Sequence, residues 1–224
     1  AALGIAKMLG FHLPPNFEAS FASVGIAELW TRWHISLSNW LRDYVFNPLG
    51  HYRKGRVRGY LNVMITFTAC GFWHGAAWHF VVWGALHGVF LVVERMLKDS
   101  PIGRWRVWGM RGVRWLLALF TFALFAWAVV YFRAATIGLA WQRTLAMFGL
   151  EPADAANLAW NGDSKVFVAA LLVGLAAQAW LKPRKGWDWV STMAWPWRVA
   201  LLAMMGLAII LSPGKTNAFI YFQF

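Results

Sequence analysis

YLNVMITFTACGFWHGAAWHFVVWGALHGVFLVV, residues 60–93, is an apolar run that contains three histidines and no charged side chain. As one continuous helix it would be about 51 Å long at about 1.5 Å per residue, whereas the hydrocarbon core of a bilayer is about 30 Å thick. The run therefore predicts a membrane segment that breaks and turns back. We expect the break at Gly71 and Gly75, which flank His74, because irregular backbone at membrane depth is tolerated only where it is buried in protein or lines a cavity.

The composition of the whole chain also indicates a membrane protein. Hydrophobic residues make up 60% of the chain and charged residues 13%, outside the range of ordinary soluble domains. Three further apolar runs, 115–132, 166–181 and 197–211, approach the ~20 residues that a membrane span needs. We therefore expect an all-α, polytopic transmembrane domain over residues 1–224, surrounded by membrane lipid.

The basic residues predict an orientation rather than a nucleic-acid partner. The net charge is +12, but the basic side chains gather in short loops between apolar runs, as the positive-inside rule describes. The loops 52–58, 95–114 and 182–185 are expected in the cytoplasm, and the region around Asp154 outside. The run 60–93 must then enter and leave on the same side, as two short crossings or as a re-entrant pair.

Residues 27–46 are aromatic and polar together, and too polar to span a membrane. If this stretch is one helix, His34, Ser38 and Arg42 fall near one face because they are four residues apart. Two interpretations stay open. The stretch is either an interfacial helix anchored at the lipid headgroups, or a polar helix packed into the domain that presents His34 to a shared cavity.

His74 is the principal candidate for a catalytic group. An ionisable side chain in hydrocarbon is costly unless it faces protein or a water-filled cavity, and imidazole exchanges protons near neutral pH. A metal site is not favoured, because there is no HExxH motif and His74 and His79 would point about 140° apart on one helix. There is also no GxSxG elbow and no pair of carboxylates in the apolar runs. The chemistry that is left is a histidine acting as a general base on a hydroxyl acceptor.

The other histidines and the cysteine have simpler interpretations. His87 is either a group facing the cavity or a satisfied donor in an interhelical hydrogen bond, and the second interpretation is favoured. His79 is expected to be structural, and His12 and His51 have no expected role. Cys70 is the single cysteine, so it forms no internal disulfide and is expected to be a packed small hydrophobe.

Four motifs together carry a family resemblance. They are ELWTRWHISLSNWLRDYVFNPLG (28–50), GFWHGAAWHFVVWGALHG (71–88), YFRAATIGLAWQRTLAMFG (131–149) and FIYFQF (219–224). In this order they resemble the C-terminal half of a membrane-bound O-acyltransferase, in the bacterial branch of alginate O-acetyltransferases. The related proteins that help to D-alanylate teichoic acids share the patterns WHIS and FWHG, but the NPLG segment and the FIYFQF ending favour the branch that acetylates polysaccharides.

The resemblance implies a fold of many transmembrane helices around a central funnel, with the N-terminal helices of that architecture absent from this chain. His74 corresponds to the invariant intramembrane histidine of the family, and His34 to its second important histidine. The donor is expected from the cytoplasm and the acceptor on the outer side. The implied location is the bacterial inner membrane, where the protein passes the bilayer several times.

The resulting prediction is an acetyltransferase that uses acetyl-CoA as donor substrate and needs neither a metal nor another cofactor. It would move the acetyl group to hydroxyls of an exopolysaccharide such as alginate, through a periplasmic acetyltransferase-like or esterase-like partner protein. His74 is the expected general base, and His34 would orient the acceptor or stabilise developing charge. The residues expected near the substrates are Arg32, Trp33, Ser38, Arg42, Asp43, Trp73 and His87. The rival functions are a transmembrane acyl conduit or transporter without chemistry of its own, and a purely structural scaffold.

Overall fold

The computed structural model describes residues 2–150, 194–197 and 199, and the regular elements within these ranges are helical. Backbone packing divides the chain into two units, 1–182 and 183–224, and the helices described below belong to the first. The expected all-α class is confirmed for the described ranges. One membrane domain over residues 1–224 stays a prediction.

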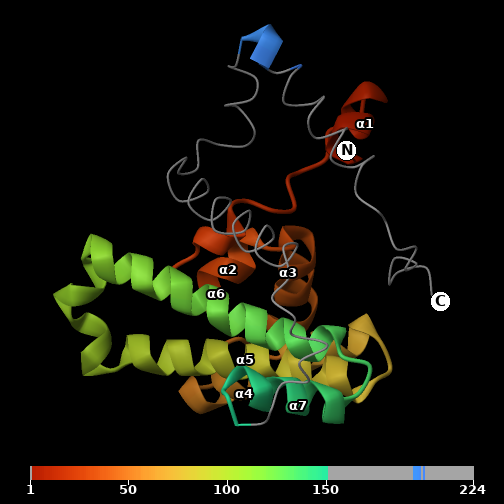
Figure 1. Ribbon diagram of the computed structural model, residues 1–224. Helices are drawn as coiled ribbons and strands as arrows, with labels where there is room; N and C mark the ends of the chain where they lie inside the picture. Colours follow the sequence, from red (N-terminus) through yellow and green to blue (C-terminus); the bar gives the residue numbers. More distant parts are fainter. Residues whose placement is uncertain (1, 151–193, 198, 200–224) are drawn as a thin grey trace. The chain divides into compact units, whose positions relative to one another are not determined.

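The elements of the first unit follow one another in a fixed order (Figure 1). They are α1 (Ala2–Met8), the 3₁₀ turn η1 (Ser20–Ala22), α2 (Ile26–Arg32), α3 (Ile35–Leu41), the π turn η2 (Arg42–Phe46), α4 (Arg56–His74), α5 (Trp78–Asp99), the 3₁₀ turns η3 (Pro101–Arg104) and η4 (Arg106–Gly109), α6 (Arg111–Arg133) and α7 (Ile137–Met147).

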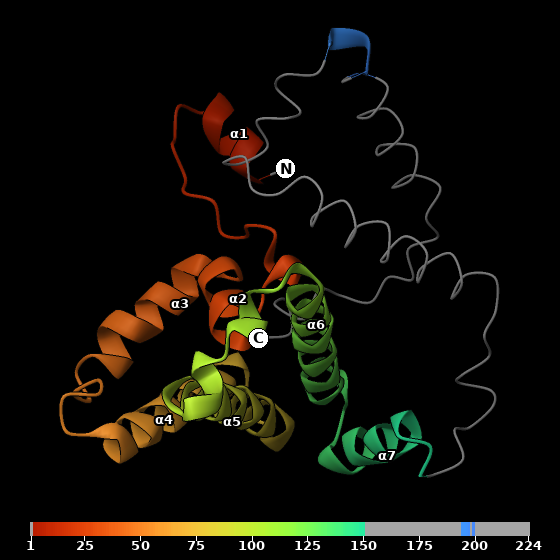
Figure 2. The ribbon, with the colours of Figure 1, turned by 90° about the vertical axis from the view of Figure 1, so that its left-hand side faces the viewer.

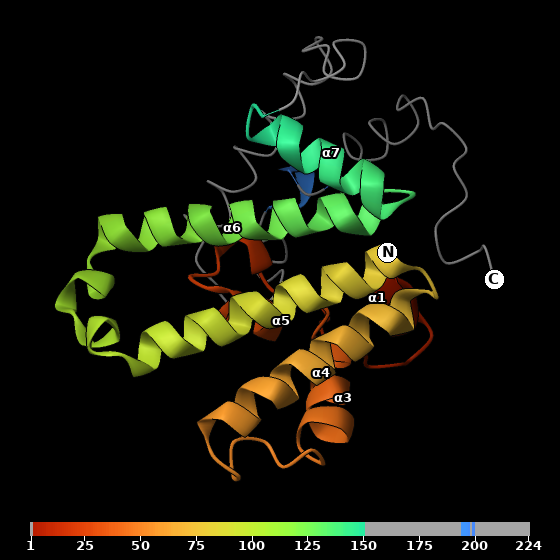
Figure 3. The same cartoon turned by 90° about the horizontal axis from the view of Figure 1, so that it is seen from below.

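Helices α4 and α5 form an antiparallel hairpin (Figure 3). The long apolar run breaks where it was expected to: α4 ends at His74, Gly75 follows as its C-cap, and α5 begins at Trp78. Gly71, the other expected breaking point, lies inside α4. With 19 and 22 residues, the two helices are about 28 Å and about 33 Å long, which is the length that two crossings need.

The hairpin brings two basic loops to one end. The loop before α4 and the segment after α5 both lie opposite the turn at residues 75–77, because the helices run antiparallel. This arrangement agrees with a chain that enters and leaves on the same side. Which side is cytoplasmic stays a prediction.

Within the described residues, α5 and α6 are long and apolar enough to cross a membrane. Helix α6 contains the whole predicted span 115–132, so this span is confirmed as helical. The predicted span 166–181, the loop 182–185 and Asp154 lie outside the described residues, as does nearly all of the predicted span 197–211.

The short helix α2 packs into the domain. It lies against α5 and α6 (Figure 2). Its side chains Ile26, Leu29 and Trp30 are buried in the core, where Trp83 of α5 and Phe125 of α6 are also found. These three side chains turn the apolar face of α2 towards the protein core. The packing therefore agrees with the second interpretation of residues 27–46, a stretch packed into the domain.

Helices α4 and α5 approach closely because glycines meet at their interface. A Cβ on Gly84 would collide with the carbonyl oxygen of Phe67 and would stand 3.0 Å from the Cα of Gly71. Backbone atoms cannot move aside as a flexible side chain can. Small residues at such crossings allow membrane helices to approach and gain van der Waals contact.

We expect Gly84→Ala to destabilise the full-length protein by about 1–3 kcal/mol, the usual cost of overpacking. Thermal unfolding in detergent micelles measures the effect. The matched control is Gly112→Ala on α6, where a Cβ has no neighbour within 4 Å. Equal melting temperatures for the two variants would contradict the close approach of α4 and α5.

Candidate active site

The polar stretch 27–46 is not one helix. Helix α2 ends at Arg32, Trp33 is extended, and His34 adopts the left-handed conformation with φ 49° and ψ 52°. From Arg42 the backbone widens into a π turn. The shared face of His34, Ser38 and Arg42 was expected only if the stretch formed one helix, and this condition does not hold. A left-handed residue at one end and a π turn at the other interrupt the 3.6-residue repeat on which that expectation rested.

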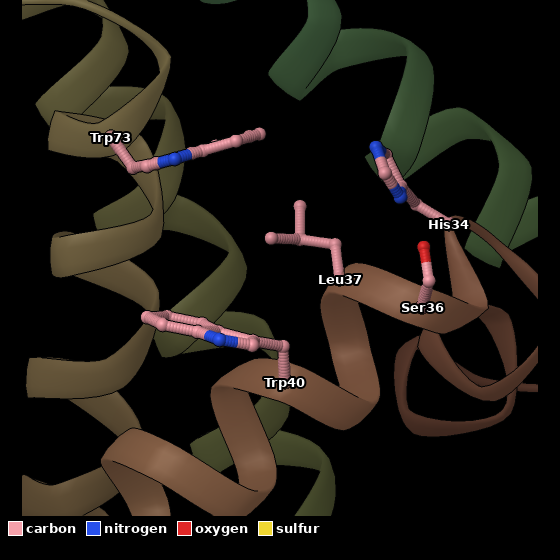
Figure 4. Close-up of a pocket in the computed structure, with 5 residues that line it drawn as sticks. All are labelled: His34, Ser36, Leu37, Trp40 and Trp73. Carbon is pink, nitrogen blue, oxygen red and sulfur yellow. The ribbon is translucent and has the colours of Figure 1, made fainter.

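A pocket lies where this break faces the end of α4 (Figure 4). It has a volume of about 380 Å³ and is lined by His34, Ser36, Leu37, Trp40 and Trp73. We call it the histidine pocket. The rings of His34 and Trp73 come from opposite sides, and Leu37 lies between them. Two predicted site residues, far apart in the sequence, thus share one pocket.

His34 is half-buried at the wall of the histidine pocket. It lies between α2 and α3, which have seven residues each and are too short to cross a membrane. Burial lowers the pKa of His34 below its ordinary value of 6.5, because removal from water penalises the charged imidazole. The neutral ring therefore dominates at pH 7.

His74 lies beside this pocket rather than in its lining. It is the last residue of α4 and directly follows Trp73. Its ring packs edge-on against Trp83 of α5 and Phe132 of α6, with centroid distances of 5.1 Å in both cases. The imidazoles of His74 and His34 are close enough to interact electrostatically. The structure thus places the two predicted catalytic histidines near each other. His74 belongs to α4 and packs against α5 and α6.

A second pocket of about 480 Å³ lies between α2, α3, α4 and α5. Its lining includes two of the predicted polar residues, Ser38 of α3 and Arg42 of η2, together with Glu94, Arg95 and Lys98 near the end of α5. We call it the basic-end pocket. The predicted substrate residues that line a pocket are therefore divided between two, with Trp73 in the histidine pocket and Ser38 and Arg42 in this one.

Four of the predicted substrate residues line neither pocket: Arg32, Trp33, Asp43 and His87. Arg32 forms a salt bridge with Glu28 on α2. Trp33 packs its ring against Phe17 and Phe125, at centroid distances of 4.9 and 5.2 Å.

Asp43, the third of these residues, is exposed and paired with Arg42. The two side chains form a salt bridge of 2.8 Å. A hydrogen bond from Arg42 lowers the pKa of the Asp43 carboxyl. This pair lies at the surface, and roles for Arg32, Trp33 and Asp43 at a substrate stay predictions.

His87 is fully buried and lines neither pocket. Its Nδ1 accepts a hydrogen bond of 3.3 Å from the indole N–H of Trp30, which ties α5 to α2. An interhelical hydrogen bond is therefore observed, but His87 accepts in it instead of donating as expected, and its buried Nε2 has no hydrogen-bond partner among the described residues. A contact of His87 with substrate stays a prediction. His79 lies 3.2 Å from the carbonyl oxygen of Tyr131 through its Nδ1, in agreement with a structural role. Cys70 is buried, as predicted.

Sequence reasoning missed four residues of the histidine pocket region. Ser36, Leu37 and Trp40 line the pocket, and Asn16 contacts the break through a hydrogen bond to the backbone N–H of Ser36. Asn16 precedes the polar stretch by more than ten residues, so no periodicity or spacing connects it to His34. Across the described residues, no group of three or more His, Cys, Asp or Glu side chains could hold a metal ion.

Residues 1–125 match the membrane-bound O-acyltransferase family. This segment contains both histidine motifs, the break at His34 and the end of α4. The chain belongs to the membrane-bound O-acyltransferase family. The family expected from the motifs is thereby confirmed.

Three relatives show how the similarity is distributed. A "probable alginate O-acetylase" of Pseudomonas putida is 33% identical over 100% of this chain and 49% of its own length. One from Azotobacter vinelandii is 40% identical over 66% of this chain and 28% of its own length. A peptidoglycan O-acetyltransferase of Helicobacter pylori is 28% identical over 100% of this chain and 45% of its own length. The chain thus spans about half or less of the length of these curated relatives.

Proposed function

We propose that this chain carries the catalytic histidines of a membrane O-acetyltransferase in the bacterial inner membrane. The enzyme takes the acetyl group of a cytoplasmic donor, acetyl-CoA, and passes it towards hydroxyls of an exopolysaccharide such as alginate. A periplasmic acetyltransferase-like or esterase-like partner completes the transfer. The observation that carries the proposal is the histidine pocket, where His34 faces the end of α4 next to His74.

The reaction needs one base and one source of charge stabilisation. The hydroxyl oxygen of the acceptor attacks the thioester carbonyl while a histidine removes the hydroxyl proton. The new C–O bond forms, the C–S bond breaks, and the CoA thiolate leaves and is reprotonated. His74 is the base in this scheme, and His34 stabilises the charge that develops on the carbonyl oxygen.

The two pockets suggest separate approaches for the two substrates. The histidine pocket adjoins Trp73 at the turn end of the hairpin, whereas the basic-end pocket includes Arg95 and Lys98 at the opposite end. We assign the basic-end pocket to the donor, because the basic loops at that end are the ones expected in the cytoplasm. The acceptor then approaches the histidine pocket from the other side.

Transfer of labelled acetyl from acetyl-CoA tests this function in membranes that contain the full-length protein and its partner. The acceptor arms are alginate and peptidoglycan, which correspond to the names of the relatives. We expect label on alginate and none when the protein is left out. Label on peptidoglycan alone would identify peptidoglycan, and not alginate, as the acceptor. Passage of label across the membrane without a new ester bond would favour the acyl conduit.

A further inference from the structure

Asn16 contacts three consecutive residues at the break between α2 and α3. Its Oδ1 accepts hydrogen bonds from the backbone N–H and the hydroxyl of Ser36, at 2.9 and 3.0 Å. Its backbone carbonyl accepts the N–H of Ile35 at 3.0 Å. Its Nδ2 lies 3.4 Å from Nδ1 of His34. The side chain and the backbone carbonyl of Asn16 therefore tie together the residues that present His34 to the histidine pocket.

These contacts determine which ring nitrogen of His34 carries the proton. The backbone N–H of Ser36 can only donate, so the atom that faces it must be the oxygen of Asn16. The amide nitrogen then faces His34, and an amide nitrogen also can only donate. Nδ1 of His34 is therefore the acceptor, and the neutral ring carries its hydrogen on Nε2.

We propose that Asn16 is a positioning residue that holds His34 in the Nε2–H tautomer, so that His34 donates a hydrogen bond to the reacting oxygen and His74 acts as the base. The inference rests on the proposed function. It separates the roles of the two histidines, because a neutral ring whose Nδ1 is occupied and whose Nε2 carries hydrogen cannot take a proton from the acceptor.

The surroundings of His34 allow this arrangement. Burial lowers the pKa of His34, and a hydrogen bond with its own backbone, which raises the pKa, offsets this only in part. Arg32, two residues earlier, is paired with Glu28. His74, on α4, directly follows Trp73, whose ring lies opposite His34 in the histidine pocket. A positive charge on His74 after it takes the proton would further disfavour charge on His34.

Asn16→Asp reverses the direction of the hydrogen bond between residue 16 and Nδ1 of His34, and it changes the shape of the side chain little. A carboxylate can only accept, so Nδ1 of His34 must carry the hydrogen, and the carboxylate raises the pKa of His34. Below that raised pKa the ring is charged and Nε2–H is present. Above it the ring becomes neutral, keeps its hydrogen on Nδ1 and loses the Nε2–H donor.

The expected result is a pH-dependent loss of acetyl transfer by the full-length Asn16→Asp variant. The ratio of its kcat to that of the unmodified protein should fall about 10²-fold as pH rises through the raised pKa, the usual cost of one lost oxyanion donor. A merely structural role would lower the ratio equally at every pH. The matched control is Asn47→Asp, the same change at an exposed residue whose amide contacts the exposed Asp43 and that lines neither pocket. Its ratio should stay near one.

A second measurement does not depend on activity. In protein with isotope-labelled histidine, NMR of the imidazole carbons and nitrogens reports the tautomer and pKa of His34, with His34→Gln assigning the signal. We expect the Nε2–H form in the unmodified protein and a raised pKa in Asn16→Asp but not in Asn47→Asp. An Nδ1–H form in the unmodified protein, or a pKa that Asn16→Asp leaves unchanged, overturns the inference even if acetyl transfer is confirmed. Absence of acetyl transfer together with the expected tautomer would contradict the proposed function instead.

Discussion

His74→Ala is expected to abolish acetyl transfer by the full-length protein while leaving its expression and membrane insertion intact. Removal of a general base costs about 10²- to 10⁴-fold in rate. The side chain lies at the end of α4 among the rings of Trp83 and Phe132, so its loss leaves the hydrogen bonds of the hairpin in place. Transfer of labelled acetyl to alginate measures the effect.

The matched control for this variant is His79→Ala. His79 belongs to the same hairpin and is also half-buried, but its Nδ1 contacts the carbonyl oxygen of Tyr131 rather than a pocket. It should retain most of the acetyl transfer. Near-normal activity of a well-expressed His74→Ala variant would remove His74 from the mechanism.

His34→Ala, His74→Ala and the double variant are expected to show similarly low acetyl transfer. Losses within one catalytic unit are strongly non-additive, because once one histidine is removed the other no longer contributes to the rate. His34 lines the histidine pocket and His74 lies close enough to interact with it electrostatically. The measurement is kcat for each of the three variants in reconstituted membranes with the partner present.

A conduit without chemistry would give a different pattern. Each single variant would then slow passage of the acetyl group partially, and the two effects would accumulate in the double variant. Substantial transfer in both single variants, with a further fall in the double, would count against the catalytic proposal and in favour of the acyl conduit.

Much of the fold was predictable because it depends on local chemistry. The break near Gly75 follows from the length of the apolar run compared with the thickness of a bilayer. Helix α6 follows from an uninterrupted apolar segment, and the burial of Cys70 from its apolar neighbours. The predicted Gly71 break failed for an equally physical reason: Gly71 serves the close approach to Gly84 inside an intact helix.

The site was predictable only in part. The motifs alone selected His34, His74 and Trp73, and the structure brings these three residues together. The assumption of one continuous helix through residues 27–46 misplaced Ser38 and Arg42, which line the other pocket. A left-handed backbone at a non-glycine residue is uncommon, and residue preferences do not anticipate it.

The sequence by itself determined the class of this protein: an apolar helical chain whose histidine motifs assign it to one family of membrane acyltransferases. These properties follow from composition, run length and motif identity, all of which are local. Only the tertiary structure decided that Asn16 reaches His34, that some of the predicted residues line two separate pockets, and that His74 packs against rings from α5 and α6. These contacts join segments far apart in the chain, and their geometry depends on how the helices pack rather than on any local preference.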